Sequence, residues 1–458
     1  MPRAGRRGFA LLGCVATVAV AASAFANAGD APTRGTKPGV SKPPSTCFWE
    51  GPISTKRPST GGFDGRTFNF PEESATYWMA RFRLPEDGRI VLRGRYPQGR
   101  YMSLNTYTDG TPVDALSDPK VKPDPGSRNP FATGARRDSK KRSWTVTVLP
   151  GAPPAGGERE PNTIYGNQSA AAPIELFYRV YEPNRGYDLT GGTGLPEATL
   201  ELAGGTAVPQ EEACPQINDA DREIPVDDVP AAGWQAVRAT PPCDAATNPG
   251  YDPVRWERFF NVNYAIEAVA TDCTEAGRAA RLAQTPVSQG GFYSNRDSAY
   301  IYAHLAREFG PVLMVQARLP RTPQTYGGPK RMPGGDMRFW SLCTGESRVT
   351  TRTPDCLADR QVLRQSGRNY TVVVSKPEDR PQNATRECGV AWLDWGANGD
   401  GAGDPDYAAL IMRNMLVSPE FEHAIQRVAR PTEEAAVMGP YFPRTEYMAR
   451  EDFEARGC

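Results

Sequence analysis

The stretch ATYWMARFRLPEDGRIVLRGRYP, residues 75–97, decides the fold because it recurs without a gap as SAYIYAHLAREFGPVLMVQARLP at residues 298–320. Three further blocks follow each copy in the same order: RYMSL, DALSDPKV and RSWTVTV after the first, and RFWSL, DCLADRQV and RNYTVVV after the second. Over the four blocks, 15 of 43 aligned positions are identical. A collinear repeat this long predicts a duplicated domain, because solenoid units are much shorter.

The repeated blocks have the pattern of β-strands. β-branched and aromatic residues alternate in residues 142–148 and 368–374, as in half-buried strands. Residues 89–95 have one apolar and one charged face, whereas residues 312–318 are apolar on both faces and should be more buried. We therefore expect a mainly β (α+β) protein of two tandem homologous β-sandwich or jelly-roll domains, the second with extra helices.

Helix patterns occur only in the second half. Asp252 followed by Pro253 suits a helix start, and an apolar stripe follows as far as residue 282. Another helix is expected at residues 419–427. Residues 407–416 have helical propensity, but their strand-like repeat partner, residues 195–202, favours a strand.

The N-terminal 26 residues predict a signal peptide. Three arginines precede an apolar run that ends in small residues. The run is short, rich in alanine and followed by no basic cluster, so a transmembrane helix is disfavoured. Arg6-Arg7 and Cys14 leave the twin-arginine and lipoprotein export routes open beside the Sec route. Residues 27–46 are rich in Gly, Pro, Ser, Thr and Lys and should form a flexible linker.

The cysteines fit an exported protein. Outside the signal peptide their number is even, which predicts up to four disulfides but leaves the pairing open. A zinc site is disfavoured because the chain has no CxxC and only His304 and His423 could assist. The eight cysteines are Cys47, Cys214, Cys243, Cys273, Cys343, Cys356, Cys388 and Cys458.

Composition and the spacing of the repeated blocks indicate where the domains begin and end, and the charge balance argues against nucleic acid as a partner. We place the first β-sandwich repeat at 47–214, an inter-domain linker at 215–250 and the second repeat, with its helices, at 251–458. Lysine plus arginine (53) equal aspartate plus glutamate (53). The chain therefore has no basic excess for nucleic-acid phosphates.

Two arginine–aspartate pairs occupy equivalent repeat positions: Arg100 with Asp118, and Arg338 with Asp359. We expect each pair to join a strand to the next loop within its own unit. Two equivalent anion sites are the alternative.

Residues 394–406, DWGANGDGAGDPD, are the densest cluster of oxygen ligands. Asp394, Asn398, Asp400 and Asp404 could supply calcium ligands, but the spacing fails the EF-hand template. Ordinary turn chemistry is favoured. No cofactor is expected, with calcium as the weaker alternative.

Tryptophans flank this loop, and exposed aromatic rings beside acidic loops can hold sugars. Residues three apart on a strand point to opposite faces, so at least one of Trp392 and Trp395 should be core. Together with Arg338 and Trp340 they are our candidate ligand-binding residues.

Catalytic motifs are lacking. There is no GxSxG elbow and no P-loop or dinucleotide fingerprint in a strand-to-helix context. A catalytic pair of carboxylates that are distant in sequence and close in space, as in glycosidases, is still an alternative.

Residues 294–320, SNRDSAYIYAHLAREFGPVLMVQARLP, with RFWSL at 338–342, resemble segments of bacterial exported proteins of unknown function built from paired β-sandwich domains. The shared features are an Asn-x-Asp-x-x-Tyr start, a Gly-Pro before an apolar strand and then an aromatic strand. The resemblance implies a fold and no catalytic residue.

These observations together predict a secreted or extracytoplasmic, cell-envelope-associated protein with no transmembrane segment after signal cleavage. We expect it to bind an envelope glycan or a small extracellular ligand, without catalysis, in the groove between its halves. The alternative is a secreted hydrolase acting on polysaccharide or ester substrates through paired carboxylates. A purely structural envelope protein is a third possibility.

Overall fold

The computed structural model describes residues 46–53, 69–156, 158–166, 172–219 and 229–458. The expected signal peptide, 1–26, lies outside the described residues, as does the linker except Thr46. Residues 43–458 belong to one compact unit, and everything described below lies within it.

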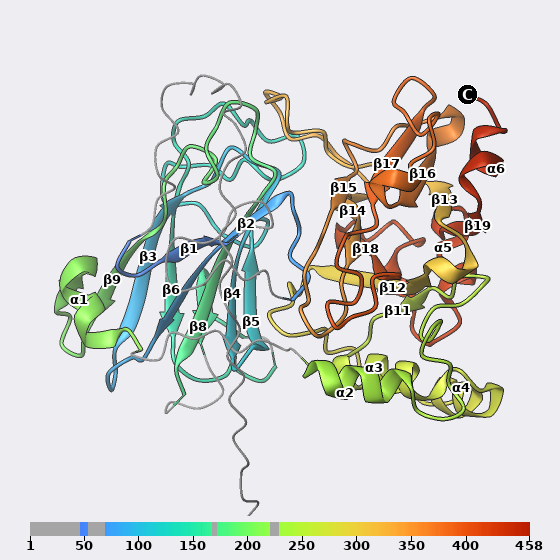
Figure 1. Ribbon diagram of the computed structural model, residues 1–458. Helices are drawn as coiled ribbons and strands as arrows, with labels where there is room; N and C mark the ends of the chain where they lie inside the picture. The colour runs from blue at the N-terminus through green and yellow to red at the C-terminus, as the bar shows by residue number, and fades with distance from the viewer. Residues whose placement is uncertain (1–45, 54–68, 157, 167–171, 220–228) are drawn as a thin grey trace, which may run out of the picture. The chain divides into compact units, whose positions relative to one another are not determined.

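The first half contains two five-stranded sheets with a shared apolar core (Figure 1). The first sheet has the order β1-β2-β8-β4-β5, formed by Glu50–Ile53, Ala75–Phe82, Ile174–Tyr181, Tyr101–Thr108 and Thr111–Ser117. The second has the order β10-β9-β3-β6-β7, formed by Ala207–Pro209, Glu197–Glu201, Arg89–Arg95, Ser143–Leu149 and Thr163–Tyr165. In β6 every second residue is buried, so Trp144, Val146 and Val148 fill the core between the sheets.

The second half repeats this arrangement. One sheet has the order β11-β12-β18-β14-β15, formed by Glu257–Arg258, Ser298–Ala306, Tyr407–Val417, Met337–Gly345 and Cys356–Ala358. The other has the order β17-β16-β13-β19, formed by Val390–Asp394, Asn369–Ser375, Val312–Arg318 and Arg444–Met448. Both sheets contribute to one apolar core.

The strand orders of the two halves correspond. Each strand from β1 to β9 takes the same place in its sheet as the strand numbered ten higher. The parallel pairs also correspond: β6 with β7, and β16 with β17. The mainly β fold class is therefore confirmed, and its sheets are otherwise antiparallel.

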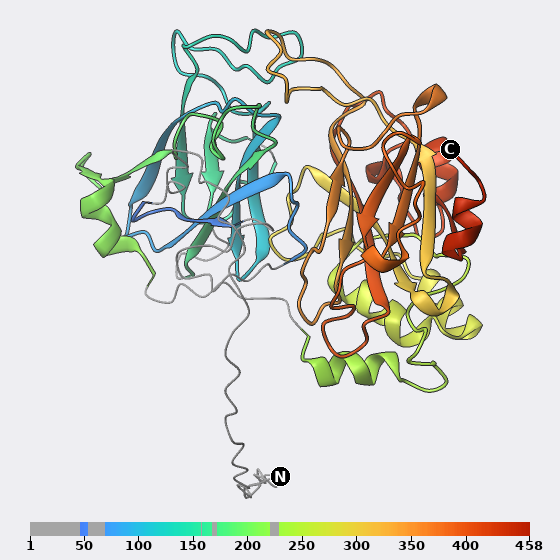
Figure 2. The ribbon, with the colours of Figure 1, turned by 45° about the horizontal axis from the view of Figure 1, so that its top comes forward.

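The helices differ from expectation in several places. The helices are α1 (Gln210–Ile217), α2 (Ala231–Arg238), α3 (Val262–Thr271), α4 (Glu275–Leu282), α5 (Glu434–Met438) and α6 (Arg450–Glu454). Helix α1 lies in the first half, beside β9 (Figure 2), so helices are not confined to the second half. Helix α2 falls inside the expected linker 215–250. Short 3-10 turns occupy Arg307–Phe309, Ser366–Arg368, Pro377–Asp379, Ile425–Arg427 and Gly439–Tyr441.

The helix expected from Asp252 begins only at Val262. Residues 257–258 pair with β12 instead, and Asn261 caps the helix by accepting a hydrogen bond from Tyr264 N at 2.9 Å. The helix expected at 419–427 is wrong except for the turn at its end. The preference for a strand at 407–416 is confirmed by β18.

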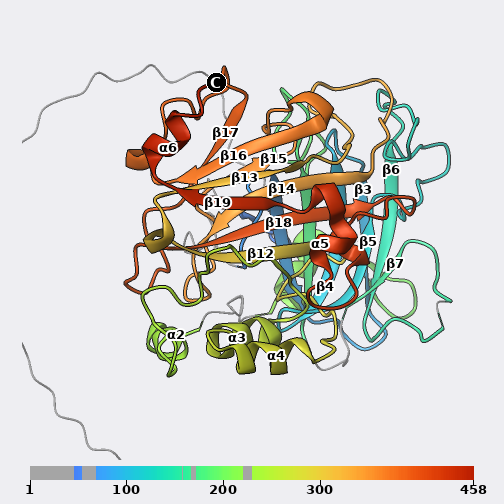
Figure 3. The same cartoon turned by 90° about the vertical axis from the view of Figure 1, so that its right-hand side faces the viewer.

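Strand β13 is buried on both faces at its start, as its composition predicted. Its outer residues Val312 and Met314 belong to one apolar cluster with Phe453 of α6. Figure 3 shows α6 beside this sheet. The C-terminal segment covers this sheet and is held there by the Cys388–Cys458 disulfide.

The prediction of disulfides is confirmed. The cysteines pair as Cys47–Cys214, Cys243–Cys273, Cys343–Cys356 and Cys388–Cys458. Within the described ranges, the helices are too short or too polar to cross a bilayer.

Candidate functional site

The equivalent arginine–aspartate pairs are exchanged between the halves. Arg100 pairs with Asp359 of the second half, and Arg338 Nη1 lies 2.9 Å from Asp118 Oδ1 of the first. The expectation that each pair stays within its unit is wrong. Burial raises the pKa of Asp118 to about 7, although Arg338 and the Met102 N–H act in the opposite direction.

The segments before β2 and β12 are exchanged in the same way. Phe70 N donates to Thr351 O, and Tyr293 N donates to Gly110 O, both at 2.8 Å. Phe70 and Tyr293 take equivalent positions, five residues before their strands. Each half thus places an arm, residues 69–72 or 290–295, against the hairpin loop of the other half.

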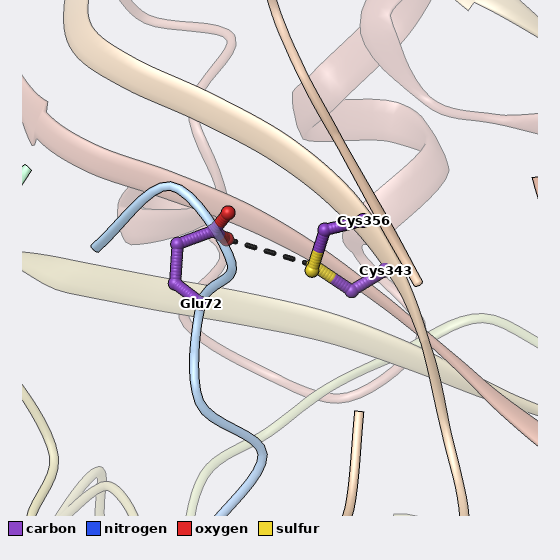
Figure 4. Close-up of side chains that lie close together, drawn as sticks. All are labelled: Glu72, Cys343 and Cys356. Atoms are coloured by element: carbon purple, nitrogen blue, oxygen red, sulfur yellow. Dashed lines mark hydrogen bonds between the residues drawn. A yellow bond between two sulfur atoms is a disulfide. The ribbon is translucent and has the colours of Figure 1, made fainter. Parts of the chain in front are cut away.

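Glu72, at the end of the first arm, is fully buried and pairs with Arg413. Ser341 Oγ donates to Glu72 Oε2 at 2.6 Å. Cys343 Sγ lies 3.5 Å from the same oxygen (Figure 4). A carboxylate beside two cysteines suggests a metal site. Here the sulfurs of Cys343 and Cys356 are joined, so neither offers the thiolate that zinc requires. The cluster is an inter-half ion pair.

A cavity lies between the arms, the facing sheets and the helices α2 and α3. Its volume is about 160 Å³. Strands β2 and β8 of the first half and β12 and β18 of the second contribute to its walls.

Strand periodicity explains which side chains reach the cavity. In β12, Tyr300, Tyr302 and His304 line it, while the alternate residues Ile301 and Leu305 enter the core of the second half. Strand β18 follows the same rule, and aromatic rings dominate the wall as a whole.

Three arginines, Arg179, Arg348 and Arg413, line the cavity, and no aspartate or glutamate among the described residues does. The Arg413 charge is offset by Glu72. No carboxylate in the described ranges forms an ion pair with Arg179, which instead donates to Asn105 Oδ1 and Tyr293 O, each at 2.7 Å.

His304 is held neutral. Burial, with Arg348 and other nearby arginines, lowers its pKa to about 3. Its Nδ1 lies 2.8 Å from the Tyr407 hydroxyl, whose pKa burial raises. The phenol has no other acceptor in the described part of the chain, so we assign it as the donor, which places the ring hydrogen on His304 Nε2.

The tryptophans proposed from sequence do not line the cavity. Trp340 and Trp395 are buried in the core of the second half. Trp392 is half-buried; its Nε1 donates to Ser375 Oγ at 3.0 Å and Arg380 lies over its ring. The remaining candidate, Arg338, bridges the halves.

The candidate calcium ligands are engaged by donors of the protein. Arg238 pairs with both Asp400 and Asp404, at 2.9 and 2.5 Å. Asp394 accepts from Gly396 N, and the Asn398 amide donates to Glu346. Asp400 also accepts from Trp234 Nε1 at 2.9 Å, and Trp234 lines the cavity, so this loop helps to fix the cavity wall.

The sequence did contain a signal for this cavity. Single arginines interrupt largely apolar strands in IELFYRVY (174–181) and YAALIMRNMLV (407–417). Strand pairing places Arg179 opposite Tyr77 and Arg413 opposite Tyr300, which are identical repeat positions. A buried arginine inside an apolar strand needs a partner, and that requirement could have marked the site.

Comparisons with known proteins give structural neighbours only. The sequence matches no protein-family model and no curated protein. Among solved structures, an uncharacterised protein from Burkholderia cenocepacia is similar, with 11% identity, a TM-score of 0.45, and coverage of 89% of this chain and 83% of that one. The VPA0106 protein from Vibrio parahaemolyticus is similar with 11% identity, a TM-score of 0.35, and coverage of 85% and 94%.

Proposed function

We propose that this protein binds a small, largely apolar molecule in the cavity between its halves, without converting it chemically. The observation that carries this proposal is the cavity of about 160 Å³ walled by aromatic rings from both halves. Ligand sites are commonly concave, apolar and placed between domains, with few polar groups. Of the two kinds of partner expected from sequence, this wall suits a small extracellular ligand better than a hydrophilic glycan.

The hydrolase alternative finds less support. A glycosidase needs two carboxyl groups across an open cleft, and none of the described lining residues is acidic. The histidine in the cavity, His304, contacts a phenol whose raised pKa keeps it protonated and unsuited to act as a nucleophile.

The proposed place of action is outside the cytoplasm, in association with the cell envelope. Four disulfides support this, because such bonds persist in oxidising compartments. The signal-peptide pattern of residues 1–26 supports it from the sequence.

We also propose that the halves are tandem β-sandwich domains derived from one duplicated domain. The equal strand order and the repeated sequence blocks support common descent. The exchanged ion pairs and arms are those of an isologous interface, in which residue i contacts j and j contacts i. A homodimer of the single domain would have provided this cavity before the duplication.

Filling the cavity tests the proposed function. Ala409 lines it from β18, and Ala409→Phe should abolish binding of the neutral fluorescent probe N-phenyl-1-naphthylamine. Ala155→Phe, at an exposed position, is the matched control and should bind like the wild type. Equal binding by both variants, at unchanged thermal stability, would place the probe elsewhere. Turnover of a p-nitrophenyl ester that Ala409→Phe abolishes would favour the hydrolase.

A further inference from the structure

Two buried polar atoms face the cavity without a hydrogen-bond partner among the described residues. They are Tyr302 Oη and His304 Nε2. Both side chains project from the same face of β12, and their rings lie edge to face with centroids 5.3 Å apart. Buried polar groups in native proteins are nearly always paired, so two such atoms side by side indicate a missing partner.

We infer that Tyr302 Oη and His304 Nε2 bind the head group of the cavity's ligand, and that this ligand is a monocarboxylic acid with an apolar body. The inference rests on the proposed function, since it assumes that a ligand occupies the cavity.

Both atoms are hydrogen-bond donors. Burial raises the pKa of Tyr302 well above its usual value, so the hydroxyl keeps its hydrogen. The neutral His304 carries its hydrogen on Nε2, because Nδ1 accepts from Tyr407. Two neighbouring donors fit the two oxygens of a carboxylate, which accepts hydrogen bonds and donates none.

An arginine lies at this end of the cavity. Of the charged groups that act on His304, Arg348 has the largest effect on its pKa, and Arg348 also lines the cavity. Glu257 acts on Tyr302 in the opposite sense and is paired with Arg281. A carboxylate placed here would be attracted by Arg348 in a site with little water.

The rest of the cavity wall indicates that the part of the ligand beyond its head group is apolar. Phe259, Trp234 and Val269 lie around this end, and Tyr77, Phe177 and Tyr181 lie further along. Such a wall rewards burial of apolar surface, which a flexible unbranched chain offers. Medium-chain fatty acids have this chemistry.

The experiment compares ligands that differ only in the head group. Decanoate, decan-1-ol and methyl decanoate are titrated as competitors of N-phenyl-1-naphthylamine, with the wild type and with Tyr302→Phe, His304→Leu and the surface control Tyr187→Phe. Wild type should bind decanoate at least about tenfold more tightly than the other two. Each cavity variant should lose about tenfold more affinity for decanoate than for methyl decanoate. Tyr187→Phe should match the wild type.

The outcomes separate the inference from the proposed function. Equal affinity for the acid, alcohol and ester, or unchanged decanoate affinity in both Tyr302→Phe and His304→Leu, would overturn the inference and leave apolar binding intact. Absence of binding for the probe and all three compounds would overturn both. A thermal unfolding transition like that of Tyr187→Phe shows that the two variants are folded.

Discussion

The Glu72 carboxylate is fully buried and joins the halves through Arg413 and Ser341. Replacement of Glu72 by alanine leaves the Arg413 guanidinium buried without its counter-charge. Breaking such a pair from one side costs about 3–5 kcal/mol. We expect this loss in the free energy of unfolding of Glu72→Ala, measured by urea denaturation.

A surface ion pair provides the control for the Glu72→Ala measurement. Arg89, half-exposed, contacts Glu201 at 2.7 Å, and Glu201→Ala should cost less than about 1 kcal/mol. The double variant Glu72→Ala with Arg413→Met should recover part of the loss, because the buried charge goes with its partner. A cost below about 1 kcal/mol for Glu72→Ala alone would show that water reaches Arg413.

Single residues also show where sequence reasoning ended. Repeat positions identified Arg100 and Asp118 as members of equivalent pairs, but equivalence cannot tell a pair within one unit from a pair exchanged between two. The alignment of the two halves shows only that each has an arginine and an aspartate at these positions. Which arginine pairs with which aspartate depends on how the sheets of the two halves pack, and the spacing of residues along the chain does not reveal that packing.

At the scale of elements, the two faces of β12 have different roles: one contributes to the core and so to stability, and the other lines the cavity. Leu305 enters the core and is fully buried, so Leu305→Ala should lower the free energy of unfolding by about 2–5 kcal/mol. Tyr302→Phe, on the opposite face, removes a buried hydroxyl without a partner and should be neutral or stabilising in the ligand-free protein. Thermal and urea denaturation of both variants would check this. A destabilisation of more than about 2 kcal/mol by Tyr302→Phe would mean that the hydroxyl has a partner, such as an ordered water.

The elements predicted correctly were those whose pattern is local. Strands β2, β3, β12 and β13 follow from the repeat and from period-two alternation. The helix expected from Asp252 started late because tertiary pairing of residues 257–258 with β12 outweighed a good capping sequence. A binding groove between the halves was expected, but the residues of the cavity wall were not predicted, because the wall combines strands of two sheets with helices and arms that only the tertiary fold brings together.

For the molecule as a whole, the contact between the halves contains charged side chains that become buried when the two halves pack together. Asp118 lies in this contact beside Arg338, fully buried, and burial raises its pKa to about 7 despite that cation. In the unfolded chain an aspartate titrates near about 3.9. Between these values the native state holds a proton on Asp118 that the unfolded state has released, so increasing pH favours unfolding.

We therefore expect Asp118 to lower the free energy of unfolding by roughly 1.4 kcal/mol per pH unit between about pH 4 and pH 7, and by about 4 kcal/mol in total. Asp118→Asn keeps the shape of the side chain and cannot ionise. The free energy of unfolding of the variant, relative to that of the wild type, should therefore increase by about 4 kcal/mol between about pH 4 and pH 7. Arg338→Met removes a cation that lowers the Asp118 pKa, and the decline should then extend above pH 7. Urea denaturation at a series of pH values gives all three curves. Parallel curves for Asp118→Asn and the wild type would mean that Asp118 titrates alike in the folded and unfolded states, and that burial in the contact between halves does not hold its proton.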